Sequence, residues 1–302
     1  MLQTLHSKET RTSTASLYCP DAFISPLEIE DAVTRALAED LGRAGDVTSV
    51  ATVPADAQAR AVVIARAAGS IAGLPVVENV MLRLAPDAQI IAHARDGDAV
   101  TAKTKLMTVT GNARAVLAAE RTALNFIGLL SGVATATASL VAKVSGTETR
   151  VVCTRKTTPG LRALQKYAVR CGGGFNHRFG LDDAVLIKDN HIAVAGGIRP
   201  ALERAKSVVG HLVKIEIEVD NLDQLREVLA TGLADVLLVD NFTPPMLTEA
   251  VALVGGTMVI EASGGITHDN AAEIAATGVD YISSGAITHS APNLDIALDI
   301  EI

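Results

Sequence analysis

The sequence contains no tryptophan, and aromatic residues make up only 3% of its 302 positions. Its formal net charge is −8, so acidic residues outnumber basic ones. Nucleic-acid-binding proteins usually carry a basic surface, and those that bind single strands stack bases on aromatic side chains. The composition therefore argues against a nucleic-acid partner, and any local cluster of cations becomes informative.

Cysteine is also scarce. Cys19, Cys153 and Cys171 are odd in number, far apart and without the spacing of zinc ligands, a pattern typical of a reducing compartment. No apolar run approaches the roughly 20 residues that span a bilayer, and the N-terminus has no apolar leader. The sequence predicts a cytoplasmic protein without a membrane partner.

The first half of the chain predicts mixed α and β structure without repeats. Residues 1–20 are expected to form a disordered tail. Ser25 followed by Pro26 is typical of a helix start and predicts a helix over residues 27–39. Alternating and helical apolar patterns predict further short elements at residues 59–67, 76–84 and 89–94.

A helix with an apolar side is expected over residues 113–130. Glu120 and Arg121 interrupt its pattern, and the simplest interpretation of such a dipeptide is an ordinary solvated pair. Gly128 and Gly132 lie close to the end of this helix and suggest tight packing or a junction between domains.

From residue 149 the pattern changes to apolar runs that start roughly 20 to 35 residues apart, the length of a βα unit. These predicted parallel strands are residues 150–153, 184–187, 213–219, 236–239, 258–260 and 281–283. In VKIEIEV, Lys214, Glu216 and Glu218 alternate with apolar residues. A charged face suits a barrel interior better than an open parallel sheet, whose two faces are covered by helices. The pattern favours an α/β barrel.

Barrel enzymes carry their sites at the carboxyl ends of the strands. Cations gather there and in the following loops, and they are suited to carboxylates or phosphates; they are Arg155, Lys156, Arg178 and Lys188. His177 could donate a hydrogen bond to substrate, although a single histidine is more often structural. In an alternative interpretation the cations pair with the aspartates at 182, 183 and 189.

Two other groups complete the predicted polar ring. Glu218 and Asp240 could hold Mg²⁺, directly or through water, or act as structural ion-pair partners. Ser263-Gly264-Gly265 and Ser284-Gly285-Ala286 suit a phosphate, unless they are simple turns. Together these groups favour a polyanionic substrate.

Several motifs, in this order, resemble those of the quinolinate phosphoribosyltransferase family, also called carboxylating nicotinate-nucleotide pyrophosphorylases. The similarity runs from about Leu27 to Ile296, and its motifs are ERTALNFIGLLSG, TRKTTPGLRALQKYAV, GGGFNHRFGLDDAVLIKDNH, EIEVDNLDQL, VLLVDNF and IEASGGI. One departure is Cys153, where many relatives carry aspartate. The resemblance does not cover the tail before Pro20.

The resemblance implies the α/β fold of a type II phosphoribosyltransferase. An N-terminal α/β sandwich over residues 21–129, completed by about residues 287–302, would accompany a seven-stranded open α/β barrel over residues 130–286. The implied reaction converts quinolinate and 5-phosphoribosyl pyrophosphate to nicotinate mononucleotide, pyrophosphate and CO₂, with Mg²⁺, in NAD biosynthesis. The implied assembly is a homodimer in which Arg121 completes the partner's site.

The resemblance also implies roles for single residues. The quinolinate carboxylates and phosphate oxygens would meet Thr154, Arg155, Lys156, His177, Arg178 and Lys188. Glu218 and Asp240 would lie near the ribose and Mg²⁺. Ser263, Gly264 and Gly285 would bind the 5-phosphate. Lys156, Lys188, Glu218 and Asp240 are the expected catalytic residues.

Two competing interpretations keep the barrel. In the first, Lys156 or Lys188 is the Schiff-base nucleophile of an aldolase, activated by a neighbouring cation. In the second, the protein binds a polyanion without turning it over. Borohydride trapping of a substrate adduct would favour the first, and tight quinolinate binding without turnover the second.

Overall fold

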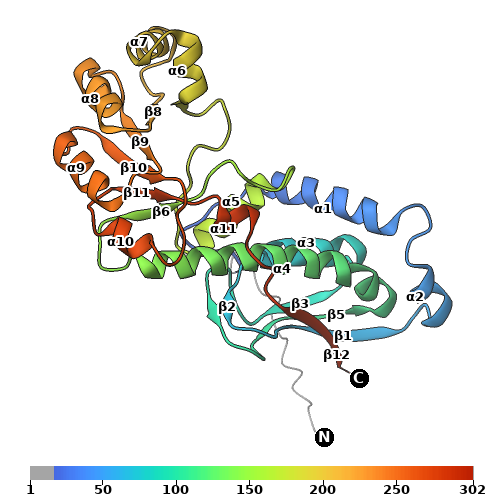
Figure 1. Ribbon diagram of the computed structural model, residues 1–302. Coiled ribbons are helices and arrows are strands. Elements are labelled where there is room, and N and C mark those ends of the chain that lie inside the picture. The colour runs from blue at the N-terminus through green and yellow to red at the C-terminus, as the bar shows by residue number, and fades with distance from the viewer. Residues whose placement is uncertain (1–16, 302) are drawn as a thin grey trace, which may run out of the picture. The chain divides into compact units, whose positions relative to one another are not determined.

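The structure is a computed structural model that describes residues 17–301, and it divides into two compact units (Figure 1). Unit 1 ends at Thr135 and includes Pro292–Ile302, and unit 2 is Ala136–Ala291. The sequence placed the corresponding boundaries at residues 129 and 287. Of the expected tail, residues 1–16 lie outside the described residues. Leu17 and Cys19 are buried, so the packed part of unit 1 includes them.

Unit 1 contains a four-stranded antiparallel sheet in the order β12-β1-β5-β3 and a small pair, β2-β4. Its strands are β1 (Gln58–Ala65), β2 (Gly69–Ser70), β3 (Gln89–Ala92), β4 (Ala99–Val100), β5 (Lys105–Asn112) and β12 (Ile296–Glu301). Its helices are α1 (Pro26–Leu41), α2 (Val47–Thr52), α3 (Leu74–Leu84) and the first part of α4 (Ala113–Lys143). Because β12 pairs with β1, the end of the chain completes this sheet.

The start of α1 confirms the sequence prediction. The Ser25 hydroxyl accepts a hydrogen bond from the backbone N–H of Leu27, and Pro26 occupies the first helical position. This arrangement satisfies an N–H group that the helix itself leaves without a partner. Ile29 and Val33 are buried at helical spacing, so one side of α1 packs into unit 1.

Helix α4 continues beyond the predicted end at Leu130. Gly128 and Gly132 lie inside it because the returning chain packs against its backbone. A Cβ atom on Gly132 would come within 2.2 Å of the Pro292 carbonyl oxygen, and the Gly128 carbonyl accepts a hydrogen bond from the Leu294 N–H at 2.9 Å. The two glycines thus mark tight packing, one of the two predicted possibilities.

By length and composition alone, α4 could cross a membrane. It has 31 residues and a window of mean hydropathy 1.6, of which 61% is buried inside the structure. Core helices pass the same test, and burial accounts for the apolar composition of α4.

Unit 2 contains a six-stranded parallel sheet in the order β6-β11-β10-β9-β8-β7. The strands are β6 (Arg150–Val152), β7 (Val185–Ile187), β8 (Ile215–Val219), β9 (Val236–Asp240), β10 (Val259–Ser263) and β11 (Tyr281–Ser283). All six predicted strands are present. The helices are α5 (Arg162–Cys171), α6 (Asp189–Ala195), α7 (Ile198–Val208), α8 (Leu222–Thr231), α9 (Pro244–Val254), α10 (Ala271–Ala275) and α11 (Ala286–His289).

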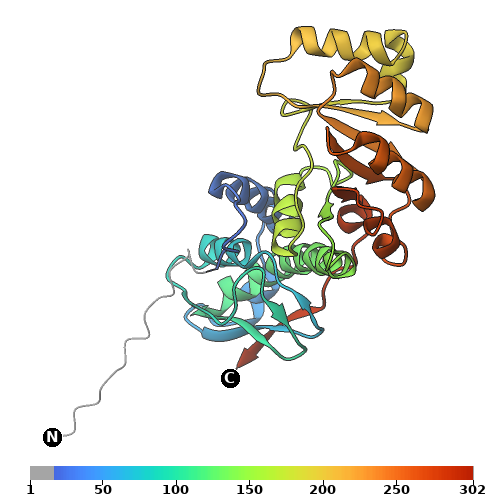
Figure 2. The same ribbon diagram turned by 90° about the vertical axis from the view of Figure 1, so that its left-hand side faces the viewer.

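The barrel is open, as the resemblance implied, but the sheet has six strands rather than seven. Phe175 stands where another strand would continue the sheet beyond β6. It forms one isolated parallel bridge with Val152, and its N–H donates to the Val151 carbonyl at 2.8 Å. The preceding Gly173 has a φ of 80°, which ends the extended pairing there. Helices α8 and α9 lie along one side of the sheet in both views (Figures 1 and 2).

Strand β8 shows the predicted alternation. Ile215 and Ile217 are fully buried, whereas Glu218 lines a cavity and Glu216 is buried on the same face of the strand. Lys214 departs from the expected charged face, because it precedes the strand and pairs with Asp235 at 2.9 Å with a largely exposed side chain.

Candidate active site

A cavity of about 460 Å³ lies at the carboxyl ends of the parallel strands of unit 2. Its lining includes every predicted site residue except Arg121 and Gly285. The lining residues are Thr154, Arg155, Lys156, His177, Arg178, Leu186, Lys188, Glu218, Leu238, Asp240, Glu261, Ser263, Gly264 and Ser283. Strands separated by more than a hundred residues in sequence therefore contribute to one polar chamber.

The glycine loops after β10 and β11 make room for neighbouring side chains. Gly264 has a φ of 82°, and a Cβ atom there would lie 2.2 Å from the Asn241 side-chain oxygen. A Cβ atom on Gly285 would lie 2.9 Å from Cδ of Lys156. Gly264 thus lines the cavity itself, and Gly285 leaves space for a lysine that lines it.

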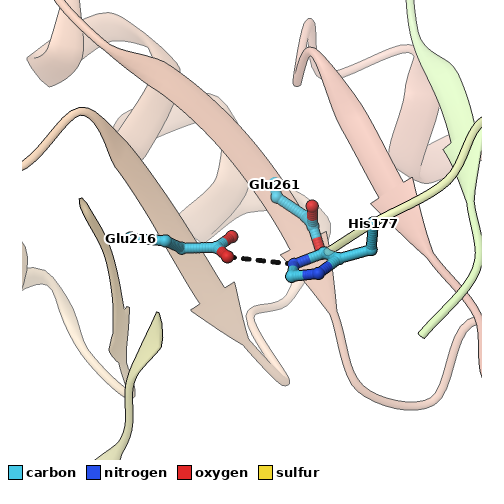
Figure 3. A group of neighbouring side chains, drawn as sticks. All are labelled: His177, Glu216 and Glu261. Atoms are coloured by element: carbon cyan, nitrogen blue, oxygen red, sulfur yellow. Dashed lines mark ion pairs between the residues drawn. The ribbon is translucent and has the colours of Figure 1, made fainter. Parts of the chain in front are cut away.

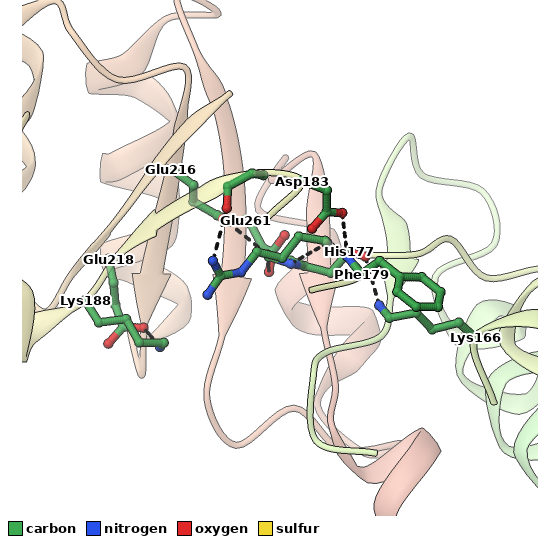
Figure 4. Close-up of polar contacts among 10 residues, drawn as sticks. Lys166, His177, Phe179, Asp183, Lys188, Glu216, Glu218 and Glu261 are labelled. Carbon is green, nitrogen blue, oxygen red and sulfur yellow. Dashed lines mark hydrogen bonds and ion pairs between the residues drawn. The ribbon is translucent and has the colours of Figure 1, made fainter. Parts of the chain in front are cut away.

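Lys188 and Glu218 form an ion pair across the ends of β7 and β8 (Figure 4). Glu218 is mostly covered, with 11% of its side chain exposed, whereas Lys188 is 45% exposed. Lys188 therefore pairs with a carboxylate of the cavity and not with the adjacent Asp189, which the alternative interpretation had named.

Asp183 has a different role from the one in that alternative interpretation. Its carboxylate accepts hydrogen bonds from the backbone N–H groups of Phe179 at 2.6 Å and Gly180 at 2.9 Å. Burial raises the pKa of Asp183, but these hydrogen bonds outweigh burial and lower it overall. Asp183 holds the loop that carries Arg178.

Arg155 and Arg178 place two guanidinium groups at the cavity. Within the described residues, the Nε atom of each is buried and has no hydrogen-bond partner. One terminal nitrogen of Arg178 donates to the Ala184 carbonyl at 3.1 Å. Burial first, and then the charge of Arg155, lower the pKa of Arg178. Two neighbouring cations with spare donors form a site that an anion would stabilise.

His177 lies between two buried carboxylates, Glu216 and Glu261 (Figure 3). Its Nε2 atom is 2.9 Å from Glu216 and 3.7 Å from Glu261, and its Nδ1 atom accepts a hydrogen bond from the Arg178 N–H at 2.7 Å. Burial lowers the pKa of His177, but Glu216 and Glu261 raise it overall. Both ring nitrogens have protein partners, so this conformation does not offer the predicted hydrogen bond to substrate.

Lys166 on α5 binds the loop that carries His177. Lys166 is fully buried, and its Nζ atom donates to the His177 carbonyl at 2.9 Å and to Sγ of Cys153 at 3.1 Å. Cys153 in turn contacts the Asn176 side-chain oxygen at 3.3 Å. Cys153, the position that departs from the family pattern, thus has a packing role beside the cavity and does not line it.

Several cavity residues were not predicted from the sequence. Glu261 and Ser283 add polar groups to the lining, and Leu186 and Leu238 add apolar walls. A signal for Glu261 was present, because it lies between apolar residues in VIEAS just as Glu218 does in VKIEIEV. The alternation argument applied to β8 therefore extends to β10.

Two sets of residues could hold a metal ion. Glu218 and Asp240 offer hard oxygen ligands at the cavity. A second set is His177, Glu216 and Glu261, each of which offers one ligand atom, and these three atoms lie within 4.8 Å of one another.

Arg121, the predicted site residue on unit 1, lies on α4 and is exposed.

The comparisons with known proteins agree with these observations. The family model described as quinolinate phosphoribosyl transferase, C-terminal domain, matches residues 133–299, and its N-terminal counterpart matches residues 46–131. A Bacillus subtilis protein named probable nicotinate-nucleotide pyrophosphorylase (carboxylating) is 41% identical over 91% of this chain and 94% of its own length. A Mycobacterium leprae protein named nicotinate-nucleotide pyrophosphorylase (carboxylating) is 43% identical over 89% of this chain and 96% of its own.

Solved structures show the same architecture. The structure of the nicotinate-nucleotide pyrophosphorylase from Francisella tularensis has a TM-score of 0.89 and 41% identity, and the match covers 93% of this chain and 98% of that one. The corresponding protein from Ehrlichia chaffeensis gives a TM-score of 0.87 at 41% identity, over 92% of this chain and 99% of its own.

Proposed function

The chain belongs to the quinolinate phosphoribosyltransferase family, and we propose on this basis that it is a decarboxylating pentosyltransferase of NAD biosynthesis. It joins quinolinate to the ribose of 5-phosphoribosyl pyrophosphate and releases nicotinate mononucleotide, pyrophosphate and CO₂. The observation that carries the proposal is a single cavity in which four cations lie with three acidic side chains, Glu218, Asp240 and Glu261.

The cations suit the two carboxylates of quinolinate. The unpartnered Nε atoms of Arg155 and Arg178 are available to accept an anion, and planar guanidinium groups bind carboxylates in a bidentate manner. Lys156 and Lys188 supply point charges for the carboxylates and the phosphate oxygens. Leu186 and Leu238 offer apolar surface to the pyridine ring.

The remaining polar groups suit 5-phosphoribosyl pyrophosphate. Ser263 and Gly264 line the cavity at the end of β10 and would bind the 5-phosphate together with Gly285. Glu218 and Asp240 would face the ribose. As the ring nitrogen attacks the anomeric carbon and pyrophosphate departs, positive charge develops on the sugar. Fixed carboxylates next to that charge, and fixed cations next to the leaving group, lower the barrier.

The proposal includes Mg²⁺, held by Glu218 and Asp240 directly or through water. Carboxylate oxygens in a polar cavity fit this ion, which keeps several waters and is usually bound by one or two carboxylates plus substrate phosphates. When bound, it supplies positive charge at the pyrophosphate oxygens. The proposed location of the enzyme is the cytoplasm.

The proposed assembly is a homodimer in which Arg121 of one subunit completes the site of the other. Arg121 is exposed, and unit 1 also exposes large apolar side chains, among them Phe23 at 85% and Leu27 at 73%. A mixture of Arg121→Ala and Lys156→Ala chains should therefore regain activity that neither variant has alone, and failure to regain it would contradict the shared site.

The geometry disfavours the aldolase interpretation at Lys188. The Nζ atom of Lys188 pairs with Glu218, whereas a Schiff-base lysine must present a free amine to its substrate. Absence of a borohydride-trapped adduct at Lys156 or Lys188 is the expected result.

The proposed function is tested by comparing quinolinate with nicotinate as the acceptor. We expect nicotinate mononucleotide, pyrophosphate and CO₂ in equal amounts from quinolinate, dependent on Mg²⁺. Activity with nicotinate and none with quinolinate would overturn the decarboxylating assignment.

A further inference from the structure

The floor of the cavity holds more acidic groups than its hydrogen bonds can satisfy. We call His177, Glu216 and Glu261 the floor cluster. Glu216 and Glu261 are only 6% and 5% exposed, and both face the Nε2 atom of His177 (Figure 3). A buried carboxylate requires a partner for its charge or a proton to remove it.

The protons of the floor cluster can be counted from its hydrogen bonds. The Nδ1 atom of His177 accepts from the Arg178 N–H, so a neutral ring carries its single proton on Nε2. That proton serves Glu216 at 2.9 Å, whereas Glu261, at 3.7 Å, is beyond hydrogen-bond distance. The nearer oxygen of Glu261 has no hydrogen-bond partner among the described residues. Glu261 is therefore the carboxyl that needs its own proton.

The electrostatic surroundings of Glu261 agree with this count. Burial first, and then the charge of Glu216, raise the pKa of Glu261 to about 7, although the charge of His177, a hydrogen bond from Ser283 and the charge of Lys188 act in the opposite direction. Two carboxylates that share one site separate their titrations in this way. Near neutral pH Glu261 thus holds a proton that it can both give and regain.

Glu261 also reaches the substrate cavity, whereas Glu216 does not line it. Glu218 pairs with Lys188, and Asp240 accepts from the Asn241 side chain at 2.6 Å. Ser283 lines the same cavity beside Glu261 and is placed to pass a proton on.

We propose that Glu261 is the acid that protonates carbon 2 of the pyridine ring when CO₂ leaves, an inference that rests on the proposed function. The bond between carbon 2 and its carboxylate breaks, and the electron pair stays on carbon 2 beside the positively charged ring nitrogen. In the same step this electron pair takes up the Glu261 proton, directly or through Ser283, and forms the new C–H bond, so the rate of CO₂ release depends on that proton. Glu261 becomes a carboxylate, and a proton from water restores it before the next turnover.

The test separates the two steps of the reaction in single-turnover experiments with the full-length protein. In Glu261→Gln, pyrophosphate release should change by less than about threefold, while CO₂ release slows by about a hundredfold, a typical contribution of a general acid. The carboxylated mononucleotide should accumulate and be detected by mass spectrometry. Glu249→Gln, at a half-exposed ion pair on α9 away from the cavity, is the matched control and should leave the two releases equal in rate.

Three outcomes would overturn the proposal. They are equal release of pyrophosphate and CO₂ in Glu261→Gln at any rate, an equal slowing of CO₂ release in the Glu249→Gln control, and a stoichiometric metal ion bound by the floor cluster in the purified protein. The wild type supplies a measurement that needs no variant. Its CO₂ release should fall about tenfold per pH unit above neutral pH, and a flat profile would equally exclude Glu261. Failure of the wild type to release pyrophosphate would instead contradict the proposed function.

Discussion

The rim and the floor of the cavity both carry carboxylates, but they treat charge differently. The rim consists of Lys156, Lys188, Glu218 and Asp240. There the Glu218 carboxylate is 11% exposed but has a cation beside it, Lys188, whose side chain is 45% exposed. On the floor, two carboxylates share a single imidazole N–H group, and their side chains are 8% and 6% exposed.

The difference follows from solvation. A charge at the rim can remain because water and an opposite charge stabilise it. On the floor the cost of burying a second anion exceeds the cost of retaining a proton. The rim is thus suited to hold polyanions by fixed charge, and the floor to store a proton. These two properties correspond to the transfer and decarboxylation steps of the proposed reaction.

Removal of a rim cation should have the largest effect. Lys156→Ala should lower kcat/KM for nicotinate mononucleotide formation by about 10²- to 10³-fold, since a fixed charge near the leaving group is lost. Lys214→Ala is the matched control, because that lysine is exposed and pairs with Asp235 away from the cavity. Steady-state kinetics with the two variants check this, and near-normal turnover of Lys156→Ala would remove it from the site.

Disruption of the rim ion pair should have the next largest effect. Glu218→Gln and Lys188→Met should each reduce kcat/KM by about a hundredfold. Because the two side chains contact each other, the double variant should lose less than the product of the two single losses. A double-mutant cycle measures this coupling, and strictly multiplicative losses would show that the two residues act independently.

The effect of the floor on stability should be smaller in free energy than either rim effect on activity. A raised pKa means that folded Glu261 keeps its proton between its ordinary value near 4.5 and about 7, while the unfolded chain releases it. The unfolding free energy of the wild type therefore falls as pH rises through this window. The raised pKa of His177 acts in the same direction, because its contribution is lost as pH rises through that pKa.

Glu261→Gln should lack the part of this pH-dependent fall in unfolding free energy that Glu261 causes. The difference in melting temperature, variant minus wild type, should therefore increase by several degrees between pH 5 and pH 8, the size expected for a stability difference of about 1 kcal/mol or more. Glu249→Gln, at a half-exposed ion pair on α9, provides the control and should show no such trend. Parallel melting curves at all pH values would contradict the stored proton.

Much of the fold followed from local patterns. The six parallel strands were predicted because apolar runs recur at the length of a βα unit, and the start of α1 because Ser25 and Pro26 are typical of a helix start. The rim residues followed from the rule that barrel sites lie where strands end. Each of these arguments uses residues that are neighbours in sequence.

The floor could not be predicted in the same way. The role of Glu261 depends on its distance from His177 and Glu216, which lie on other segments, and on the hydrogen bond that occupies Nδ1 of His177. The buried contact between Lys166 and Cys153 likewise joins separate segments. Tertiary proximity, not composition, decided both.

The difference between rim and floor is tested most directly by titrating Glu261 itself. Nuclear magnetic resonance of protein labelled with carbon-13 at the glutamate carboxyls, with Glu261→Gln to assign the signal, would follow its protonation. The account predicts a midpoint near the value of about 7 given above. A midpoint close to the ordinary glutamate value near 4.3 would contradict it.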